Sequence, residues 1–281
     1  MNAVSSLTSD IAMAREAVAK RLSGIDPHDL AAQRIAYDAF SETDPMPEMA
    51  GQAELTMGGV QCLGLMPKGS SGDHIVLWLH GGGYVMGSSR SHKGLASQIA
   101  HKAGMSTVIP DYRLAPENKF PAPVEDAVAV YQAVMAEGVK PENIILAGDS
   151  AGGGLAVMTA LKLREMKVGQ PAGLMLLSPW VDLSTSGWSI EAKAKRDPFL
   201  TRGALQMRTQ QYLGDRSMHD PAVDVLKADL RGLPPEERPA ARQVVITAGF
   251  FLVPFAVLLF GMFGARVTPP YAAAGAIMAG A

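Results

Sequence analysis

Short runs of apolar residues alternate along the middle of the chain with longer stretches of helical periodicity. Four such runs, each bounded by turn residues, predict buried strands over residues 74–79, 106–110, 143–147 and 174–177. Two longer stretches, residues 122–136 and 153–163, predict helices. Strands that alternate with helices pack as a mostly parallel sheet covered on both faces. The pattern therefore predicts an α/β fold with a doubly wound sheet.

The segments that flank this alternation have other patterns. Apolar residues recur at helical spacing over Ile11–Leu22 and again over Asp29–Phe40, whereas loose alternation over Glu54–Met66 is typical of strands. Residues 184–225 are polar and irregular. We therefore expect residues 1–50 to form a helical segment, the first strands to follow it, and residues 184–225 to form a second segment outside the sheet.

The apolar run that ends at Ala147 leads directly into Gly148-Asp149-Ser150-Ala151-Gly152, and a helix is predicted to follow. A Gly-x-Ser-x-Gly sequence between a strand and a helix is the form of a nucleophile elbow. Small flanking residues allow a turn so tight that the serine hydroxyl stands clear of the backbone. The following helix would direct its free N–H groups and the positive end of its dipole at the reacting centre.

A second motif, His80-Gly81-Gly82-Gly83, follows the strand predicted over residues 74–79. Consecutive glycines leave backbone N–H groups uncovered, so that a carbonyl oxygen can approach them closely. Fixed donors of this kind are what a tetrahedral oxyanion requires. Alone, three glycines are equally well explained as a flexible loop, but together with the elbow they favour an oxyanion loop.

Four motifs in a fixed order give the chain a specific resemblance. They are His80-Gly81-Gly82-Gly83-Tyr84, Asp111-Tyr112-Arg113-Leu114-Ala115-Pro116-Glu117, Phe120-Pro121-Ala122-Pro123 and Gly148-Asp149-Ser150-Ala151-Gly152-Gly153. Over about residues 10–235 the chain resembles the hormone-sensitive-lipase-like branch of the α/β-hydrolases, which includes bacterial carboxylesterases. The resemblance implies an α/β-hydrolase core over residues 51–235. It also implies a helical lid made by residues 1–50 and 184–225.

The resemblance implies hydrolysis of short-chain acyl esters, and it assigns roles to individual residues. Ser150 would be the nucleophile, and the N–H groups of Gly82, Gly83 and Ala151 would form the oxyanion hole. Tyr84 and Trp180 would line the substrate pocket, although core packing explains them equally well. Among the histidines, His80 is expected to shape the glycine loop, and His92, His101 and His219 to be surface or packing residues.

The triad acid and base that the family places after the nucleophile are not found in this sequence. The last aspartate is Asp229 and the last histidine is His219, and residues 238–281 contain no Asp, Glu or His. The order Ser, acid, His that this fold requires is therefore not completed. We expect the C-terminal part of the fold to be missing, and the esterase activity of the chain to be impaired.

Residues 236–281 look unlike the rest of the chain. The run from Val244 to Ala265 contains no charged residue, and as a helix it would span about 33 Å at ~1.5 Å per residue, against a hydrocarbon core of ~30 Å. We expect a membrane-type segment here that replaces the last part of the fold. The alternative is that residues 243–249 are the next strand of the sheet and that the rest is a buried helix.

Composition narrows the function classes further. A net charge of -2 and a pI near 6.3 give no electrostatic footprint for nucleic acid. A single cysteine, Cys62, and a polar first ten residues without an apolar core predict a cytoplasmic protein, with possible membrane contact through residues 244–265. The sequence has no His-x-x-x-His and no paired cysteines, so we expect no metal and no cofactor.

Three hypotheses remain open from the sequence. The chain is a serine carboxylesterase acting on a small-molecule ester, with its triad completed outside the recognised motifs. It is a non-catalytic remnant that binds acyl compounds. Or it is a membrane-tethered fusion, joined after Pro235 to a segment foreign to the family. The sequence does not specify the oligomeric state.

Overall fold

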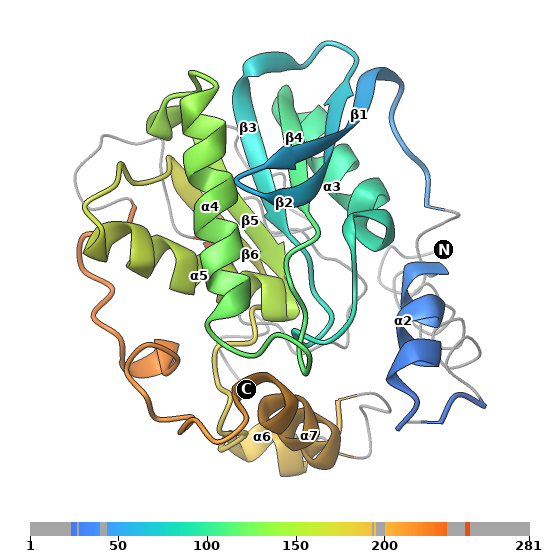
Figure 1. Cartoon of the computed structure of the whole chain (residues 1–281), viewed down its shortest axis with the longest axis vertical. Coiled ribbons are helices and arrows are strands. Elements are labelled where there is room, and N and C mark those ends of the chain that lie inside the picture. Colours follow the sequence, from blue (N-terminus) through green and yellow to red (C-terminus); the bar gives the residue numbers. More distant parts are fainter. Residues whose placement is uncertain are drawn as a thin grey trace, which may run out of the picture.

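A single mixed sheet organises the computed structural model, which describes residues 24–26, 28–39, 44–192, 194, 200–234 and 245–247. Its strands lie in the order β1-β2-β4-β3-β5-β6-β7 (Figure 1). Their bounds are β1 (Met49–Met57), β2 (Val60–Pro67), β3 (Ser71–Leu79), β4 (Met105–Pro110), β5 (Ile144–Asp149), β6 (Gly173–Leu177) and β7 (Val245–Thr247). The β1–β2 and β2–β4 pairs are antiparallel, and every pair from β4 to β7 is parallel.

Six α-helices accompany the sheet within the described ranges: α2 (Leu30–Asp38), α3 (Ser89–Ala103), α4 (Ala122–Ala136), α5 (Ser150–Glu165), α6 (Trp188–Ala192) and α7 (Arg202–Leu213). Helices α4 and α5 cover one face of the sheet and α3 covers the other (Figure 1). The predicted doubly wound, mostly parallel sheet is therefore confirmed. The helix expected over Asp29–Phe40 is α2, while the one expected over Ile11–Leu22 lies outside the described residues.

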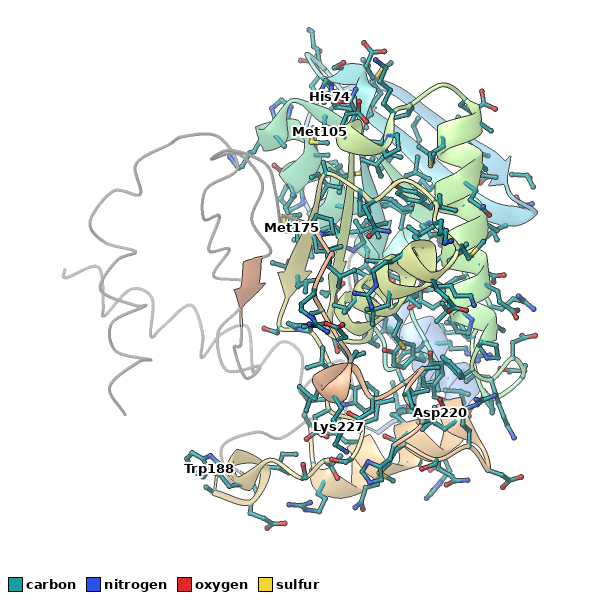
Figure 2. All side chains as sticks on the ribbon, turned by 90° about the vertical axis from the view of Figure 1, so that its left-hand side faces the viewer. His74, Met105, Met175, Trp188, Asp220 and Lys227 are labelled. Carbon is teal, nitrogen blue, oxygen red and sulfur yellow. The ribbon has the colours of Figure 1, made fainter. Side chains whose placement is uncertain are left out.

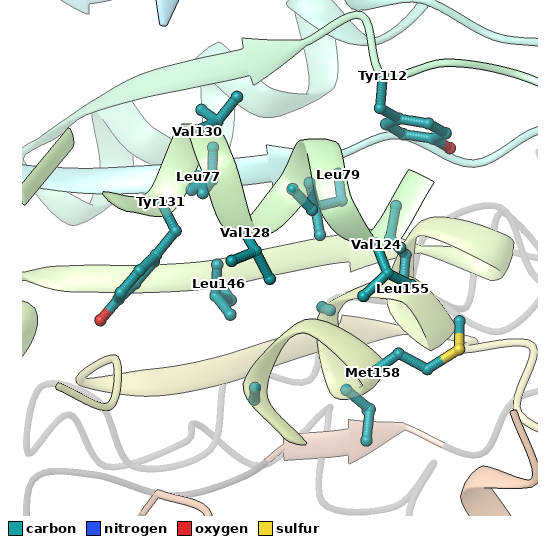
Figure 3. Close-up of a cluster of buried hydrophobic side chains, with 14 of the residues drawn as sticks. Leu77, Leu79, Tyr112, Val124, Val128, Val130, Tyr131, Leu146, Leu155 and Met158 are labelled. Atoms are coloured by element: carbon teal, nitrogen blue, oxygen red, sulfur yellow. The ribbon is translucent and has the colours of Figure 1, made fainter. Parts of the chain in front are cut away.

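Strand β3 shows how the core is divided between the two faces. Successive side chains of a strand point to opposite faces, and so Leu77 and Leu79 pack under α4 and α5, whereas Val76 and Trp78 pack under α3. All four side chains are at most 2% exposed. Figure 3 shows Leu77 and Leu79 beneath the side chains of α4 and α5. Each leucine buried in this way contributes ~1.5–3 kcal/mol to folding relative to an exposed one.

The parallel strands bring their carboxyl ends together at one end of the sheet. His74 and Met105, near the amino ends of β3 and β4, lie at the opposite end of the molecule from Trp188, Asp220 and Lys227 (Figure 2). The segment expected over residues 184–225 is therefore placed beyond the carboxyl ends, and it contains α6 and α7. In open α/β sheets this edge is where ligands bind.

The start of the predicted membrane segment is a strand of the sheet. Val245–Thr247 form β7, which pairs parallel with Met175–Leu177 of β6. The expectation of a membrane segment beginning at Val244 is therefore wrong for these three residues, which agree instead with the alternative that residues 243–249 are the next strand of the sheet. Two β-branched residues followed by Thr suit a strand that completes the backbone hydrogen bonds of β6.

Residues 248–265, the remainder of the predicted membrane segment, lie outside the described residues. Among the helices that the structure does describe, none combines the length and the apolarity that crossing a bilayer requires.

Candidate active site

The predicted nucleophile lies on a tight turn between β5 and α5. Ser150 has a φ of 51°, in the left-handed region that non-glycine residues rarely occupy, and it is the first residue of α5. Its carbonyl accepts a hydrogen bond from the N–H of Trp180 at 2.7 Å. Positive φ in a serine costs ~1–3 kcal/mol and marks functional sites. The backbone strain expected of a nucleophile elbow is therefore present.

The elbow packs against the end of β3, from which the glycine loop leaves. Gly148 pairs with Leu79 across the parallel β3–β5 ladder. At Gly152, a Cβ atom would lie 1.9 Å from the carbonyl oxygen of Leu79 and 2.5 Å from that of His80. Only a residue without a side chain allows this approach. The two motifs, about seventy residues apart in sequence, are therefore neighbours at the carboxyl edge of the sheet.

The glycine loop has three successive residues with positive φ: Gly82 at 118°, Gly83 at 64° and Tyr84 at 64°. A Cβ atom on Gly82 would lie 2.1 Å from the carbonyl oxygen of Met86, so the loop turns too tightly for any other residue. The Gly82 carbonyl accepts hydrogen bonds from the N–H groups of Val85 and Met86. Within the described part of the chain, no hydrogen bond engages the N–H of Gly82 or Gly83.

Beneath this loop, Asp149 holds the backbone of Gly81. The N–H of Gly81 donates to Asp149 Oδ1 at 3.0 Å, and His92 Nε2 lies 3.2 Å from the same oxygen. Burial raises the pKa of Asp149, but the charge of His92 and its hydrogen bond outweigh this effect and hold the pKa below its usual value. Asp149, the residue before the predicted nucleophile, therefore joins the elbow to the glycine loop.

His80 has the environment of a neutral packing residue. It is fully buried, its Nδ1 lies 2.8 Å from the Gly81 carbonyl, and its ring stacks on Tyr112 at 4.2 Å. Burial lowers its pKa to about 3, and the charge of His92 adds to the effect. A general base works best with a pKa near the operating pH. His80 therefore fits the predicted role of shaping the loop, and not that of a base.

Tyr84 and Trp180, the predicted pocket residues, lie together with Tyr212 of α7. Tyr84 stacks on Tyr212 with ring centroids 3.8 Å apart, and it lies 5.8 Å from Trp180. Tyr84 is 0% exposed and its hydroxyl has no partner among the described residues, whereas Trp180 is half-buried and donates its Nε1–H to the carbonyl of Asp182. The burial of Tyr84 fits the core-packing alternative, and its role in the pocket stays a prediction.

Two arginines reach the glycine loop, and the sequence pattern indicates neither of them. Arg34 of α2 donates to the carbonyls of Val85 and Ala115 at 2.7 and 2.9 Å and forms an ion pair with Glu117. Arg208 of α7 packs its methylene groups beside Gly83 and bonds to Gln33. No local pattern could indicate these contacts, because the partners lie 51–175 residues apart.

The structure gives Ser150 no base among the described residues. Its half-buried hydroxyl has no hydrogen bond there. The sequence left open whether His92 lies on the surface or in the packed interior; it is buried against Asp149 and is therefore a packing residue. His219 is exposed and lies 3.5 Å from Asp224. His101 is exposed as well. In the part of the chain described here, no group of three His, Cys, Asp or Glu residues could hold a metal.

Comparisons with known proteins agree with the observed fold. A family model described as the alpha/beta hydrolase fold matches residues 76–241. An acetyl-hydrolase of Streptomyces hygroscopicus is 36% identical over 203 residues, which cover 72% of this chain and 68% of the relative.

Solved structures show the same likeness. An esterase from the bacterial hormone-sensitive lipase family is 38% identical with a TM-score of 0.76, over 83% of this chain and 77% of that one. The esterase EstE5, in a crystal soaked with p-nitrophenyl butyrate, is 30% identical with a TM-score of 0.72, over 79% of this chain and 75% of that one.

Proposed function

The chain belongs to the hormone-sensitive-lipase branch of the α/β-hydrolase family, and on this basis we propose that it is a carboxylic-ester hydrolase with Ser150 as its nucleophile. The observation that carries the proposal is the backbone of Ser150, held at a φ of 51° between β5 and α5 and next to the glycine loop. The relatives named acetyl-hydrolase and esterase support the assignment of a carboxylesterase by resemblance.

The proposed reaction is acyl transfer through a covalent intermediate. The Ser150 oxygen attacks the ester carbonyl and forms a tetrahedral oxyanion, which collapses with loss of the alcohol to leave an acyl-enzyme. Gly82, Gly83 and Ala151 would donate their N–H groups to the oxyanion. The free amides of the first two and the position of Ala151 in the first turn of α5 support this assignment. Water then hydrolyses the acyl-enzyme.

We further propose that the 281-residue polypeptide hydrolyses esters slowly. The proton of Ser150 has to be accepted by a base, and residues 238–281 contain no histidine. Among the described residues, His80 is held neutral by burial and His92 is bound to Asp149. Triad members act as a unit, so that losing the base removes most of the rate, while the oxyanion donors and binding retain ~10³–10⁴ over water.

The proposed substrates are esters with short acyl chains, and α2, α6 and α7 are the proposed lid. The family resemblance carries the chain-length assignment, and the soak of EstE5 with p-nitrophenyl butyrate suggests a practical probe. The lid assignment rests on Arg34 and Arg208, through which α2 and α7 contact the glycine loop. We propose a lid segment over residues 1–50 and a hydrolase core over residues 51–235, to which Val245–Thr247 add the strand β7.

Two alternatives would leave Ser150 without turnover. A non-catalytic acyl-binding remnant would bind the probe and release no p-nitrophenol. A membrane tether would have to use residues after Thr247, since Val245–Thr247 belong to β7. Residues 248–265 are 18 residues, near the lower limit of the ~17–25 that a spanning helix needs, and the described helices include none that could span. We therefore prefer the esterase.

The test compares three polypeptides with p-nitrophenyl acetate and p-nitrophenyl butyrate: the full chain, its Ser150→Ala variant, and a chimera that carries a relative's C-terminus after Pro235. We expect slow turnover in the full chain, loss of that turnover in Ser150→Ala, and a rate at least ~10³-fold higher in the chimera. Exposed Ser186, changed to Ala, serves as the matched control.

Different outcomes refute different parts of the proposal. A chimera without Ser150-dependent turnover would refute the esterase assignment. Fast Ser150-dependent turnover in the unmodified chain would refute the claim of impairment. A full chain that is monodisperse only in detergent would favour the tether.

A further inference from the structure

A chain of buried hydrogen bonds runs below the glycine loop from β5 to the start of α3. Asp149, at the end of β5, accepts from the N–H of Gly81, and His92 of α3 lies 3.2 Å from the same carboxylate. On the far side of its ring, His92 Nδ1 lies 2.8 Å from the hydroxyl oxygen of Ser91. Asp149 and His92 are both 6% exposed. The network therefore operates away from water.

The protonation of His92 follows from counting protons in this network. The Ser91 hydroxyl has one proton, and that proton is donated to the carbonyl of Ser88 at 2.9 Å. The Ser91 oxygen also accepts from the N–H of Ser88 at 2.9 Å, so its remaining lone pair faces His92 Nδ1. With the Ser91 proton on the Ser88 carbonyl, His92 Nδ1 is the donor of the 2.8 Å contact with Ser91 and carries a proton. The Gly81 N–H lies 3.3 Å from His92 Nε2 but closer to Asp149 Oδ1, at 3.0 Å, so it donates to the carboxylate. Nε2 then meets the ionised Asp149 as a donor at 3.2 Å and carries the second proton.

The charged groups around His92 agree with this count. Asp149 on β5 and Asp38 on α2 both raise the pKa of His92 against the effect of burial, and its pKa lies above the usual value. His80, whose ring lies 5.5 Å away, has a pKa lowered to about 3 and so adds no positive charge. Tyr37 of α2, at 6.0 Å, has a pKa raised by burial and stays neutral.

We propose that His92 is a buried imidazolium cation whose ion pair with Asp149 positions the Gly81 amide and, through it, the donors of Gly82 and Gly83. Burying the Asp149 carboxylate without a counterion would be costly. The His92 cation keeps Asp149 ionised, so that its oxygen accepts the hydrogen bond from the Gly81 N–H. His92 is thus a positioning residue that never touches the substrate. The catalytic part of this inference rests on the esterase function proposed above.

The charge of His92 is tested by NMR on the full chain labelled with ¹⁵N-histidine. The His92 signals are assigned by their loss in His92→Gln. We expect both ring nitrogens to be protonated at pH 7, and the Asp149→Asn variant to lower the pKa of His92. A neutral His92 with one bare ring nitrogen at pH 7 in the full chain would overturn the proposal.

The positioning role is tested by hydrogen exchange at the amide of Gly81. His92→Leu removes both the charge and the donor, and we expect exchange to rise at least about tenfold, as for loss of one charge-assisted hydrogen bond. His92→Gln keeps a donor near the Nε2 position and should restore part of the protection. The matched control is His101→Gln on the exposed side of α3, which should exchange as the parent does. Equal protection in His92→Leu and the parent would overturn the role.

Turnover separates positioning from a general loss of stability. In Ser150-dependent hydrolysis of p-nitrophenyl acetate, misplaced oxyanion donors should lower kcat by about 10²-fold and leave KM almost unchanged. A fall in kcat that tracks only the unfolded fraction would contradict the proposal. If His92→Leu does not fold, His92→Gln and Asp149→Asn decide the same question. If the chimera with a relative's C-terminus shows no Ser150-dependent turnover, the esterase proposal fails, and the NMR and exchange results still decide the role of His92.

Discussion

The contact between the elbow and β3 is so close that a single methyl group at Gly152 should disturb it. Replacing Gly152 with Ala would place a Cβ atom 1.9 Å from the carbonyl oxygen of Leu79 and 2.5 Å from that of His80. Both neighbours are backbone atoms, so no side chain can rotate to make room. Either β3 or the first turn of α5 has to move, and the β3–β5 ladder beside the nucleophile moves with it.

Two opposing terms set the magnitude of this effect. Gly152 lies in α5, where alanine would stabilise the helix by ~0.5–1 kcal/mol. Forcing an extra carbon into a packed site costs ~1–3 kcal/mol, and an overlap with backbone lies at the upper end of that range. The net expectation is a loss of ~1–2 kcal/mol in the free energy of unfolding. For a chain of this size that corresponds to a fall of ~2–8 °C in Tm.

The matched control is Gly203→Ala in α7. Gly203 is exposed and has nothing within 4 Å of its would-be Cβ atom, so only the helix-propensity term remains and the variant should be more stable than the parent. Urea titration followed by circular dichroism gives both midpoints. The two substitutions should therefore shift the midpoint in opposite directions. A Gly152→Ala protein at least as stable as the parent would refute the close approach of the elbow to β3.

Three further predictions follow from buried polar groups. Tyr112→Phe removes a 2.6 Å hydrogen bond to the carbonyl of His80 and should cost ~1 kcal/mol in urea titration. Tyr212→Phe removes a buried hydroxyl that has no partner among the described residues, and it should leave the free energy of unfolding unchanged or raise it. A larger loss of stability in Tyr212→Phe than in Tyr112→Phe would contradict these contacts. Because burial lowers the pKa of His80 to about 3, the contribution of His80 to stability should be full above pH 6.5 and fall by about 2 kcal/mol from pH 6.5 to 5, because the unfolded chain binds a proton there and the folded chain does not. His80→Gln should flatten that slope and His101→Gln should keep it, and a slope equal in all three proteins would refute the burial. Burial raises the pKa of the Cys62 thiol to about 12, so the native protein should resist a thiol-specific colorimetric disulfide reagent at pH 8 and react once it is unfolded; fast reaction of the native thiol would show that it is accessible.

The strands and helices of the sheet could be predicted because their patterns are local. The run expected over residues 174–177 became β6, Gly173–Leu177, and the helix expected over residues 122–136 became α4 with the same bounds. A strand buried on both faces is a continuous apolar run, and β5 is buried at every position. The elbow was predictable for the same reason, since its strand, turn and helix are contiguous in the sequence.

Contacts that join distant segments were not predictable in the same way. The apolar side of α3 packs under Val76 and Trp78. The helix has so many polar residues that its sequence shows no clear helical periodicity of apolar positions. In the sequence, Arg34 cannot be distinguished from an ordinary surface residue. Only the folded chain shows its hydrogen bonds to the carbonyls of Val85 and Ala115. The strand β7 was only one of two interpretations of the sequence, because a short β-branched run inside a long apolar run does not show where a strand would begin or end.

The strained residues of the site are supported by parts of the chain that do not include its C-terminus. Ser150 and Tyr84 both hold positive φ, at a cost of ~1–3 kcal/mol each. Two contacts offset this cost: the burial of Tyr84 against Tyr212, and the close approach of Gly152 to β3. Both contacts are made by residues within 71–213. The proposed nucleophile and the proposed oxyanion donors are therefore shaped before any base is supplied. A family-type C-terminus should consequently add a base to a site whose geometry already exists, which is why the chimera is expected to gain rate without a change in the backbone around Ser150.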